Sequence, residues 1–173
     1  MKETTAKKKF MWNMAGSLCN SLSSMLLLII VNRISGESRG GFFALAYSTA
    51  QLLFSVGGFE IRPVQSTDIK NKFTFNQYFT SRMLNCIIML ICMIGYIVVN
   101  GYTGVEALTV FWILGYRMVE AVADVYSGLF QQRERIDISG KEMLMRSGIS
   151  TITFTIILWL TDNLLYAAMT LTL

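Results

Sequence analysis

The sequence contains no histidine, a single proline and few charged residues. The absence of histidine excludes histidine-based metal sites and removes the commonest general base of enzymes. Charged residues make up 15% of the chain, against about 25% in an average soluble domain. The three cysteines, Cys19, Cys86 and Cys92, lie in apolar segments and do not indicate a disulfide framework. No nucleotide-binding or catalytic motif occurs. We therefore expect a protein that is not an enzyme and binds no cofactor or metal.

Apolar segments of great length are present instead. The chain of 173 residues is 53% hydrophobic, and its mean hydropathy is +0.49. Five apolar runs approach or exceed the roughly 20 residues that a helix needs to cross a bilayer; they cover about 10–34, 41–61, 79–99, 105–130 and 143–160. A sixth run, 164–173, provides about 15 Å of helix, half a bilayer. We predict an all-α, polytopic transmembrane helix bundle with about five full spans and a truncated sixth, in an incomplete chain.

Basic residues are concentrated at three places along the chain. Twelve of the 15 lie before the first run or in the links 62–82 and 132–146. These twelve are Lys2, Lys7, Lys8, Lys9, Arg62, Lys70, Lys72, Arg82, Arg133, Arg135, Lys141 and Arg146. The opposite side has only Arg33 and Arg39. The positive-inside rule then predicts a cytoplasmic N-terminus. This asymmetry explains the net charge of +4, so we expect the lipid bilayer, and no nucleic acid, as a partner.

The fourth run contains three charged residues, Arg117, Glu120 and Asp124. Their spacings of three and four residues place them on one face of a helix. Each such charge costs about 3 kcal/mol at the bilayer centre on insertion scales, so the face should point toward other helices or a water-filled cavity. We interpret it as a candidate substrate-binding or cavity face. The alternative is an ion pair between Arg117 and Glu120 that only stabilises packing.

Two further polar groups flank the first and second runs. Asn13 and Asn20 lie in the first half of the first run, which we interpret as a helix facing a polar interior; close helix packing through small residues is the alternative. After the second run, Pro63 predicts that the helix ends near Arg62. We expect Arg62, Gln65 and Asp68 to form a cytoplasmic mouth, or else a solvated helix end. Aromatic residues beside lysines in this link predict a short interfacial helix or turn.

Three motifs built from these residues resemble those of a known family. They are Tyr116-Arg117-x-x-Glu120-x-x-x-Asp124-x-x-x-Gly128-Leu129-Phe130-Gln131-Gln132, Asn13-Met14-x-Gly16-Ser17 and Arg62-x-x-Gln65-x-x-Asp68. The family is that of the bacterial polysaccharide biosynthesis membrane proteins. These are lipid-linked oligosaccharide flippases of the multidrug/oligosaccharidyl-lipid/polysaccharide exporter superfamily. The similarity covers essentially the whole chain, 1–173, which corresponds to the N-terminal lobe of such a transporter.

The resemblance implies export of an undecaprenyl-diphosphate-linked oligosaccharide across the bacterial plasma membrane during cell-surface polysaccharide biosynthesis. It implies that Arg117 contacts the pyrophosphate or an acidic sugar, while Glu120 and Asp124 tune the cavity or couple to a cation. The expected partners are the lipid-linked oligosaccharide and either the missing C-terminal lobe or a second copy. Two alternatives remain: a drug/cation antiporter of the same superfamily, which Arg117 disfavours, and a non-transporting membrane assembly subunit.

Overall fold

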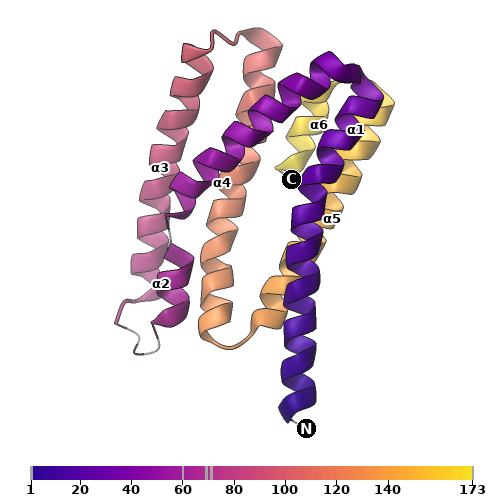
Figure 1. Cartoon of the computed structure of the whole chain (residues 1–173). Coiled ribbons are helices and arrows are strands. Elements are labelled where there is room, and N and C mark those ends of the chain that lie inside the picture. Colours follow the sequence, from indigo (N-terminus) through magenta and orange to yellow (C-terminus); the bar gives the residue numbers. More distant parts are fainter. Residues whose placement is uncertain (1, 60, 69, 71, 173) are drawn as a thin grey trace.

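The computed structural model of the chain is built of α-helices that are joined by short links (Figure 1). The backbone is described for residues 2–59, 61–68, 70 and 72–172, and the side chains from residue 6 onward within these ranges. No strand occurs in them. The helices are α1 (Lys2–Gly58), α2 (Ile61–Thr67), α3 (Phe75–Val99), α4 (Gly104–Gln132), α5 (Ile136–Thr161) and α6 (Leu164–Leu171). The predicted all-α class is confirmed.

The longest helix, α1, consists of two arms that meet at a kink. Gly36 has a φ of 85° and a ψ of 170°, which is not helical, and only glycine adopts this backbone conformation readily. Figure 1 shows the first arm leading away from the N-terminus and the second arm returning from the bend toward α2. The two predicted runs 10–34 and 41–61 correspond to these arms. Residues 35–40 between the two runs are part of the bent helix and form no separate loop.

Three helices in the described ranges are long and apolar enough to cross a membrane: Ala6–Gly58 of α1, α3 and α5. The predicted number of five full spans is therefore not reached. One reason is that the two arms of α1 form one continuous element. The other is that Arg117, Glu120 and Asp124 interrupt the apolar sequence of α4. The last apolar run forms only the eight residues of α6.

The prediction that the second run ends near Arg62 is wrong. α1 ends at Gly58, and Pro63 lies in the first turn of a new short helix, α2. Proline is tolerated there because the first backbone N–H groups of a helix have no intrahelical acceptor. The result is a short helix in the 62–82 link, where the sequence predicted a short helix or turn.

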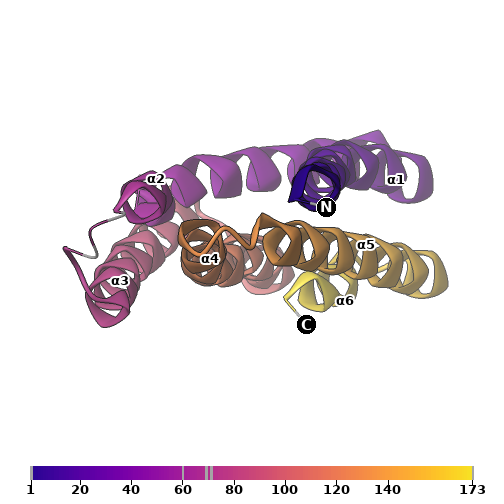
Figure 2. The same ribbon diagram turned by 90° about the horizontal axis from the view of Figure 1, so that it is seen from below.

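The helices pack in two layers. Figure 2 shows α1 and α2 on one face of a row that contains α4 and α5, with α6 on the opposite side of that row. α6 packs against α4 and α5. The main apolar core lies toward the Gly36 bend and includes Val31 and Phe43 of α1, Ile113 of α4 and Phe154 of α5. The half of the bundle nearer the N-terminus therefore has space for polar groups between the arms of α1.

Candidate functional site

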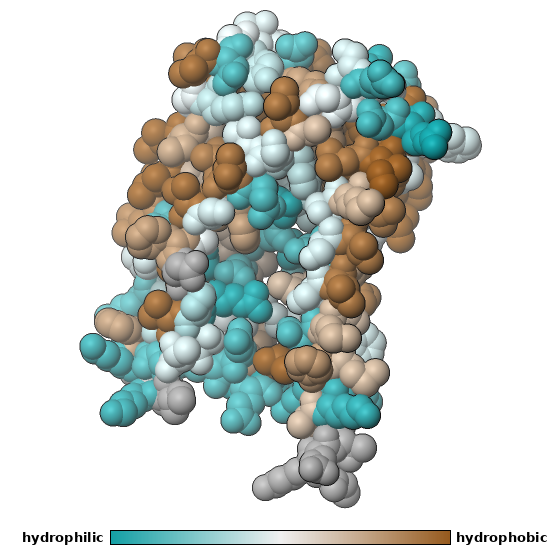
Figure 3. Space-filling view, in the orientation of Figure 1, coloured by the Kyte–Doolittle hydropathy of each residue, from teal (hydrophilic) through white to brown (hydrophobic). Residues whose placement is uncertain are grey.

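A cleft of about 760 Å³ lies between the two arms of α1 and extends down to α4 and α5. Figure 3 shows the molecule hollowed at this place, with hydrophilic residues gathered in a largely apolar surface. Five of the eight predicted site residues line it, namely Asn20, Arg62, Arg117, Glu120 and Asp124. The spacing of Arg117, Glu120 and Asp124 thus brings all three to one cavity. Its volume lies within the range of about 300–1,000 Å³ that is typical of ligand sites.

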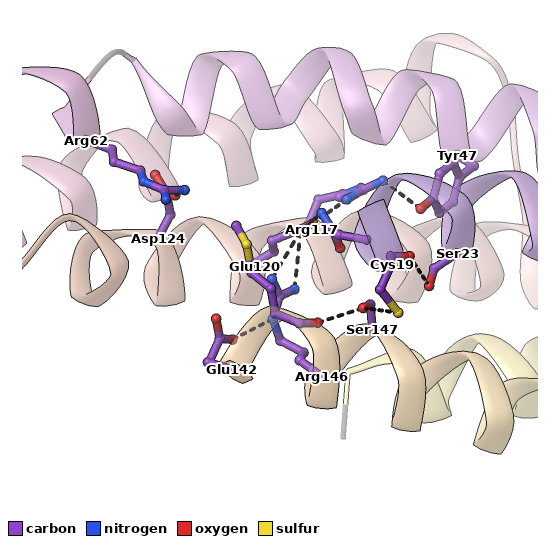
Figure 4. A network of polar contacts seen from close by, with 12 residues as sticks. Cys19, Ser23, Tyr47, Arg62, Arg117, Glu120, Asp124, Glu142, Arg146 and Ser147 are labelled. Atoms are coloured by element: carbon purple, nitrogen blue, oxygen red, sulfur yellow. Dashed lines mark hydrogen bonds and ion pairs between the residues drawn. The ribbon is translucent and has the colours of Figure 1, made fainter. Parts of the chain in front are cut away.

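Glu120 is the centre of a network that joins three helices (Figure 4). Its carboxylate accepts hydrogen bonds from Arg117 on the same helix and from Arg146 of α5 at 3.3 Å. The amide of Asn20 on the first arm donates to the same carboxylate, also at 3.3 Å. Arg146 donates in addition to Glu142 at 2.8 Å. The ion pair between Arg117 and Glu120 therefore exists, as part of a larger set of charged groups.

Arg117 also reaches the second arm of α1. Its guanidinium donates to the Tyr47 hydroxyl at 2.6 Å, and its central carbon lies 4.6 Å from the centroid of the Tyr47 ring. The side chain is only 6% exposed. Its Nε has no hydrogen-bond partner among the described residues. Arg117 is thus held at the cleft by an aromatic ring and a carboxylate while one buried donor stays unsatisfied, which is costly unless a ligand or water accepts from it.

Asp124 forms a second charged group one helical turn away from Glu120. One carboxylate oxygen accepts from Arg62 at 3.0 Å and the other from Arg82 at 2.9 Å. Arg82 has no exposed side-chain surface, and it also donates to the carbonyl oxygen of Gly57 at 2.7 Å. This group therefore ties α1, α2 and α3 to α4. Figure 4 shows Arg62 and Asp124 set apart from the residues around Glu120.

The other three predicted site residues, Asn13, Gln65 and Asp68, do not line the cleft. A Cβ built on Gly140 would lie 2.5 Å from the backbone nitrogen of Asn13, so Asn13 lies where α1 and α5 cross at closest approach. Gln65 of α2 is fully buried against α4, where exchanging the oxygen and nitrogen of its amide lets it donate to the Val125 carbonyl oxygen at 3.1 Å. Neither residue lines the cleft.

Asp68 closes the turn that precedes α3. Its carboxylate accepts from the backbone nitrogens of Lys72 at 2.9 Å and Phe73 at 3.0 Å. It accepts from the Tyr78 hydroxyl as well, at 2.9 Å. The backbone N–H groups of Phe73 and Lys72 lower the pKa of this carboxyl below its ordinary value. Asp68 therefore orders the link, and of the three residues expected to form a mouth only Arg62 lines the cleft.

Sequence reasoning missed four residues that belong to these charged groups or contact them. Arg82 and Arg146 were counted among the basic residues that set the orientation, and Tyr47 and Glu142 were not considered. One signal was available, because Arg82 and Arg146 both lie within a turn of the start of an apolar run. An arginine so close to an apolar run is a candidate for pairing with a carboxylate inside the bundle.

The lining of the cleft is polar and carries charges of both signs. Three guanidinium and three carboxylate groups line it, belonging to Arg62, Arg117, Arg146, Glu120, Asp124 and Glu142. Arg82, directly behind Asp124, adds one further positive charge. Arginine binds phosphate and carboxylate oxygens in a two-pronged geometry. Among the described residues, no group of three or more metal-ligating side chains is placed to hold an ion.

Comparison with protein-family models, with curated proteins and with solved structures finds no match for this chain.

Proposed function

We propose that this chain is a lobe of a membrane transporter that moves an anionic, lipid-linked oligosaccharide across the bacterial plasma membrane. The substrate class is that of an undecaprenyl-diphosphate-linked saccharide, and the process is the export step of cell-surface polysaccharide biosynthesis. The observation that supports this most directly is the polar cleft of about 760 Å³ with Arg62, Arg117 and Arg146 in its lining. Its guanidinium groups suit a diphosphate, and its hydroxyl and amide groups suit a saccharide.

The proposal includes a membrane arrangement. The two arms of α1 cross the bilayer separately, α3, α4 and α5 cross it once each, and α6 packs against α4 and α5. The N-terminus then lies in the cytoplasm together with the links 62–82 and 132–146. The charges of α4 face the cleft and one another, which reduces the cost of placing them within a bilayer. A second lobe, or a second copy of the chain, encloses the open side of the cleft.

The pairing of the carboxylates disfavours the drug/cation antiporter. Glu120 accepts from Arg117 and Arg146, and Asp124 accepts from Arg62 and Arg82. A carboxylate that already holds two guanidinium groups is a poor ligand for another cation, because like charges within a few ångströms repel the incoming ion. The positive groups are therefore the better candidates for substrate contact.

The test is binding of an undecaprenyl-diphosphate-linked saccharide to the chain in lipid nanodiscs. Arg117→Met removes the guanidinium and leaves Glu120 with Arg146 as its partner, so the carboxylate does not become an isolated buried charge. A hydrogen bond to a charged group contributes about 1.5–3 kcal/mol, so we expect binding to weaken roughly 10- to 100-fold. Arg117→Lys should retain part of the affinity because it keeps the charge.

Arg33→Met is the matched control, because it also replaces one arginine and Arg33 is exposed on α1 outside the cleft. It should bind the saccharide like the unmodified chain. Equal affinity of the Arg117→Met variant and the control would refute the proposed role of the cleft. Absence of any binding by the unmodified, correctly folded chain would favour the assembly subunit instead.

A further inference from the structure

A second polar cavity, separate from the cleft, lies beside the N-terminal part of α1. Its volume is about 430 Å³. The first arm of α1 forms one side, and the other side is formed by the beginning of α5. The lining residues are Lys8, Lys9, Trp12, Arg135, Asp137 and Lys141. We refer to it as the basic pocket.

The basic pocket has a strong excess of positive charge. Four of its lining side chains are cationic and one is a carboxylate, which gives a net charge of +3. The carboxylate, that of Asp137, already accepts from Arg135 at 3.3 Å. The ammonium group of Lys9 donates to the backbone oxygen of Glu134 at 2.8 Å, which holds the lysine against the start of α5. Segments more than 120 residues apart in sequence are thus drawn together around a concave basic surface.

The start of α5 adds a backbone contribution. α5 is 26 residues long and begins after Arg135, which makes no side-chain capping hydrogen bond. The first N–H groups of a helix have no intrahelical acceptor, and the helix dipole makes this end positive. Phosphate groups bind such helix ends readily. Because Arg135, Asp137 and Lys141 from this end of α5 all line the pocket, the positive end of the helix dipole adds to the charge of the side chains.

Aromatic and apolar residues accompany the basic pocket on α1. The Lys141 ammonium lies 5.2 Å from the centroid of the Trp12 ring. Phe10 and Met11, which precede Trp12 on the same helix, expose more than half of their surface. Tryptophan beside lysine is typical of the boundary between headgroups and acyl chains. A free phosphate ion would use only the charged part of this surface. A phospholipid would use both parts, with its acyl chains along the exposed apolar side of α1.

We propose that the basic pocket binds the phosphate group of an anionic phospholipid. Its location at the cytoplasmic surface of the membrane rests on the membrane arrangement proposed above. The binding itself requires neither the cleft nor transport. A bound lipid here would connect α1 to the link between α4 and α5, and so fix one side of the cleft.

The test places a single fluorescent reporter in the pocket. Replacing Trp112 and Trp159 with phenylalanine leaves Trp12 as the only tryptophan. The reporter chain is reconstituted in bilayers that contain either brominated phosphatidylglycerol or brominated phosphatidylcholine, since bromine quenches tryptophan on contact. We expect phosphatidylglycerol to be preferred at Trp12 by about tenfold. Lys8→Gln with Lys141→Gln should abolish most of this preference, and Lys141→Arg should keep it.

The matched control is Lys70→Gln with Lys72→Gln, which removes the same charge from another cytoplasmic link and leaves the basic pocket unchanged. Its preference should equal that of the unmodified reporter chain. An equal loss in both double variants would indicate diffuse attraction to the membrane surface and overturn the proposal. A saturable response of Trp12 to inorganic phosphate, without preference for phosphatidylglycerol, would overturn the lipid assignment. Saccharide binding in the cleft is measured separately, so either proposal can fail alone.

Discussion

Gly16 of α1 lies directly against Gly140 of α5, with backbone in contact with backbone. A Cβ on either glycine would approach the backbone of the other helix to less than 3.0 Å, closer than such atoms normally come. Glycines permit this close approach of helices, as they do at many helix crossings in membranes. The crossing holds the first arm of α1 on α5, at the end of the bundle where the basic pocket and the cleft are found.

Gly140→Ala should therefore destabilise the bundle. The added methyl group must push α1 away from α5, and overpacking of this kind costs about 1–3 kcal/mol. Gly148→Ala is the control on the same helix, because a Cβ there meets no atom within 4 Å; it should be neutral or stabilise α5 by up to about 1 kcal/mol. Thermal unfolding in detergent, followed by the loss of the monodisperse species, measures both. Equal midpoints for the two variants would contradict the close crossing.

Asp124→Asn should be far more disruptive than the loss of Arg62. Without this carboxylate, Arg82 is a fully buried cation that lacks a counter-charge, and breaking a buried pair costs about 3–5 kcal/mol. Arg62→Gln leaves Asp124 paired with Arg82, and Arg62 is 25% exposed, so its loss should cost about 1 kcal/mol or less.

Thermal unfolding of the two single variants checks this order. The double variant Arg82→Met with Asp124→Leu provides the control, since neutral groups can replace a buried ion pair. It should recover much of the stability that Asp124→Asn loses. Equal unfolding temperatures of Asp124→Asn and Arg62→Gln would show that the buried Arg82 does not need Asp124 as a counter-charge.

The turn between α2 and α3 should depend on pH through Asp68. Hydrogen bonds from the backbone of Phe73 and Lys72 lower the pKa of this carboxyl below 3.8. A carboxyl whose pKa is lowered on folding stabilises the folded state above its unfolded pKa, and this contribution is lost as the pH falls through the lower, folded pKa. The turn should therefore stay protected from neutral pH down to about pH 4 and open at more acidic pH.

Hydrogen exchange of the Lys72 and Phe73 amides, corrected for intrinsic rates, measures this protection. Asp68→Asn should expose both amides already at neutral pH and should show no acid transition. The same variant should be cut faster by trypsin after Lys70 and Lys72, which are exposed. Unchanged exchange in Asp68→Asn would show that the carboxylate does not order the turn.

The proposed membrane orientation can be tested with two single cysteines. In a background where Cys19, Cys86 and Cys92 are replaced by alanine, Asn100→Cys should react with an impermeant thiol reagent added to intact cells. Arg133→Cys should react only after the membrane is opened. Both positions are exposed and have negative φ values, so a cysteine fits without strain. Labelling of Arg133→Cys from outside would overturn the orientation.

The local part of the cleft could be predicted from the sequence. Helical periodicity alone places Glu120 and Asp124 one turn apart on one side of α4, and both line the cavity. The predicted run 105–130 also corresponds closely to α4, because turn residues on either side of the segment leave little freedom in its bounds. These features depend on residues within a single helix.

The partners of these carboxylates could not be predicted in the same way. Arg82 and Arg146 belong to α3 and α5, and their contacts depend on how those helices dock on α4, which no sequence period encodes. Similarly, the polar residues around Gly36 resemble a link between two helices. One pair of glycine dihedral angles bends the helix there without a loop, and local composition cannot distinguish the two cases.

The bend at Gly36 sets the direction in which the whole second arm of α1 runs. From Gly36 to Gly58 the arm has about 22 residues and a length of about 33 Å. A difference of about 10° in the angle of this bend would place the far end of the arm about 6 Å from its present position. The backbone angles of Gly36 therefore decide how far the second arm stands from Glu120 and Asp124 on α4, although Gly36 lies at the other end of that arm.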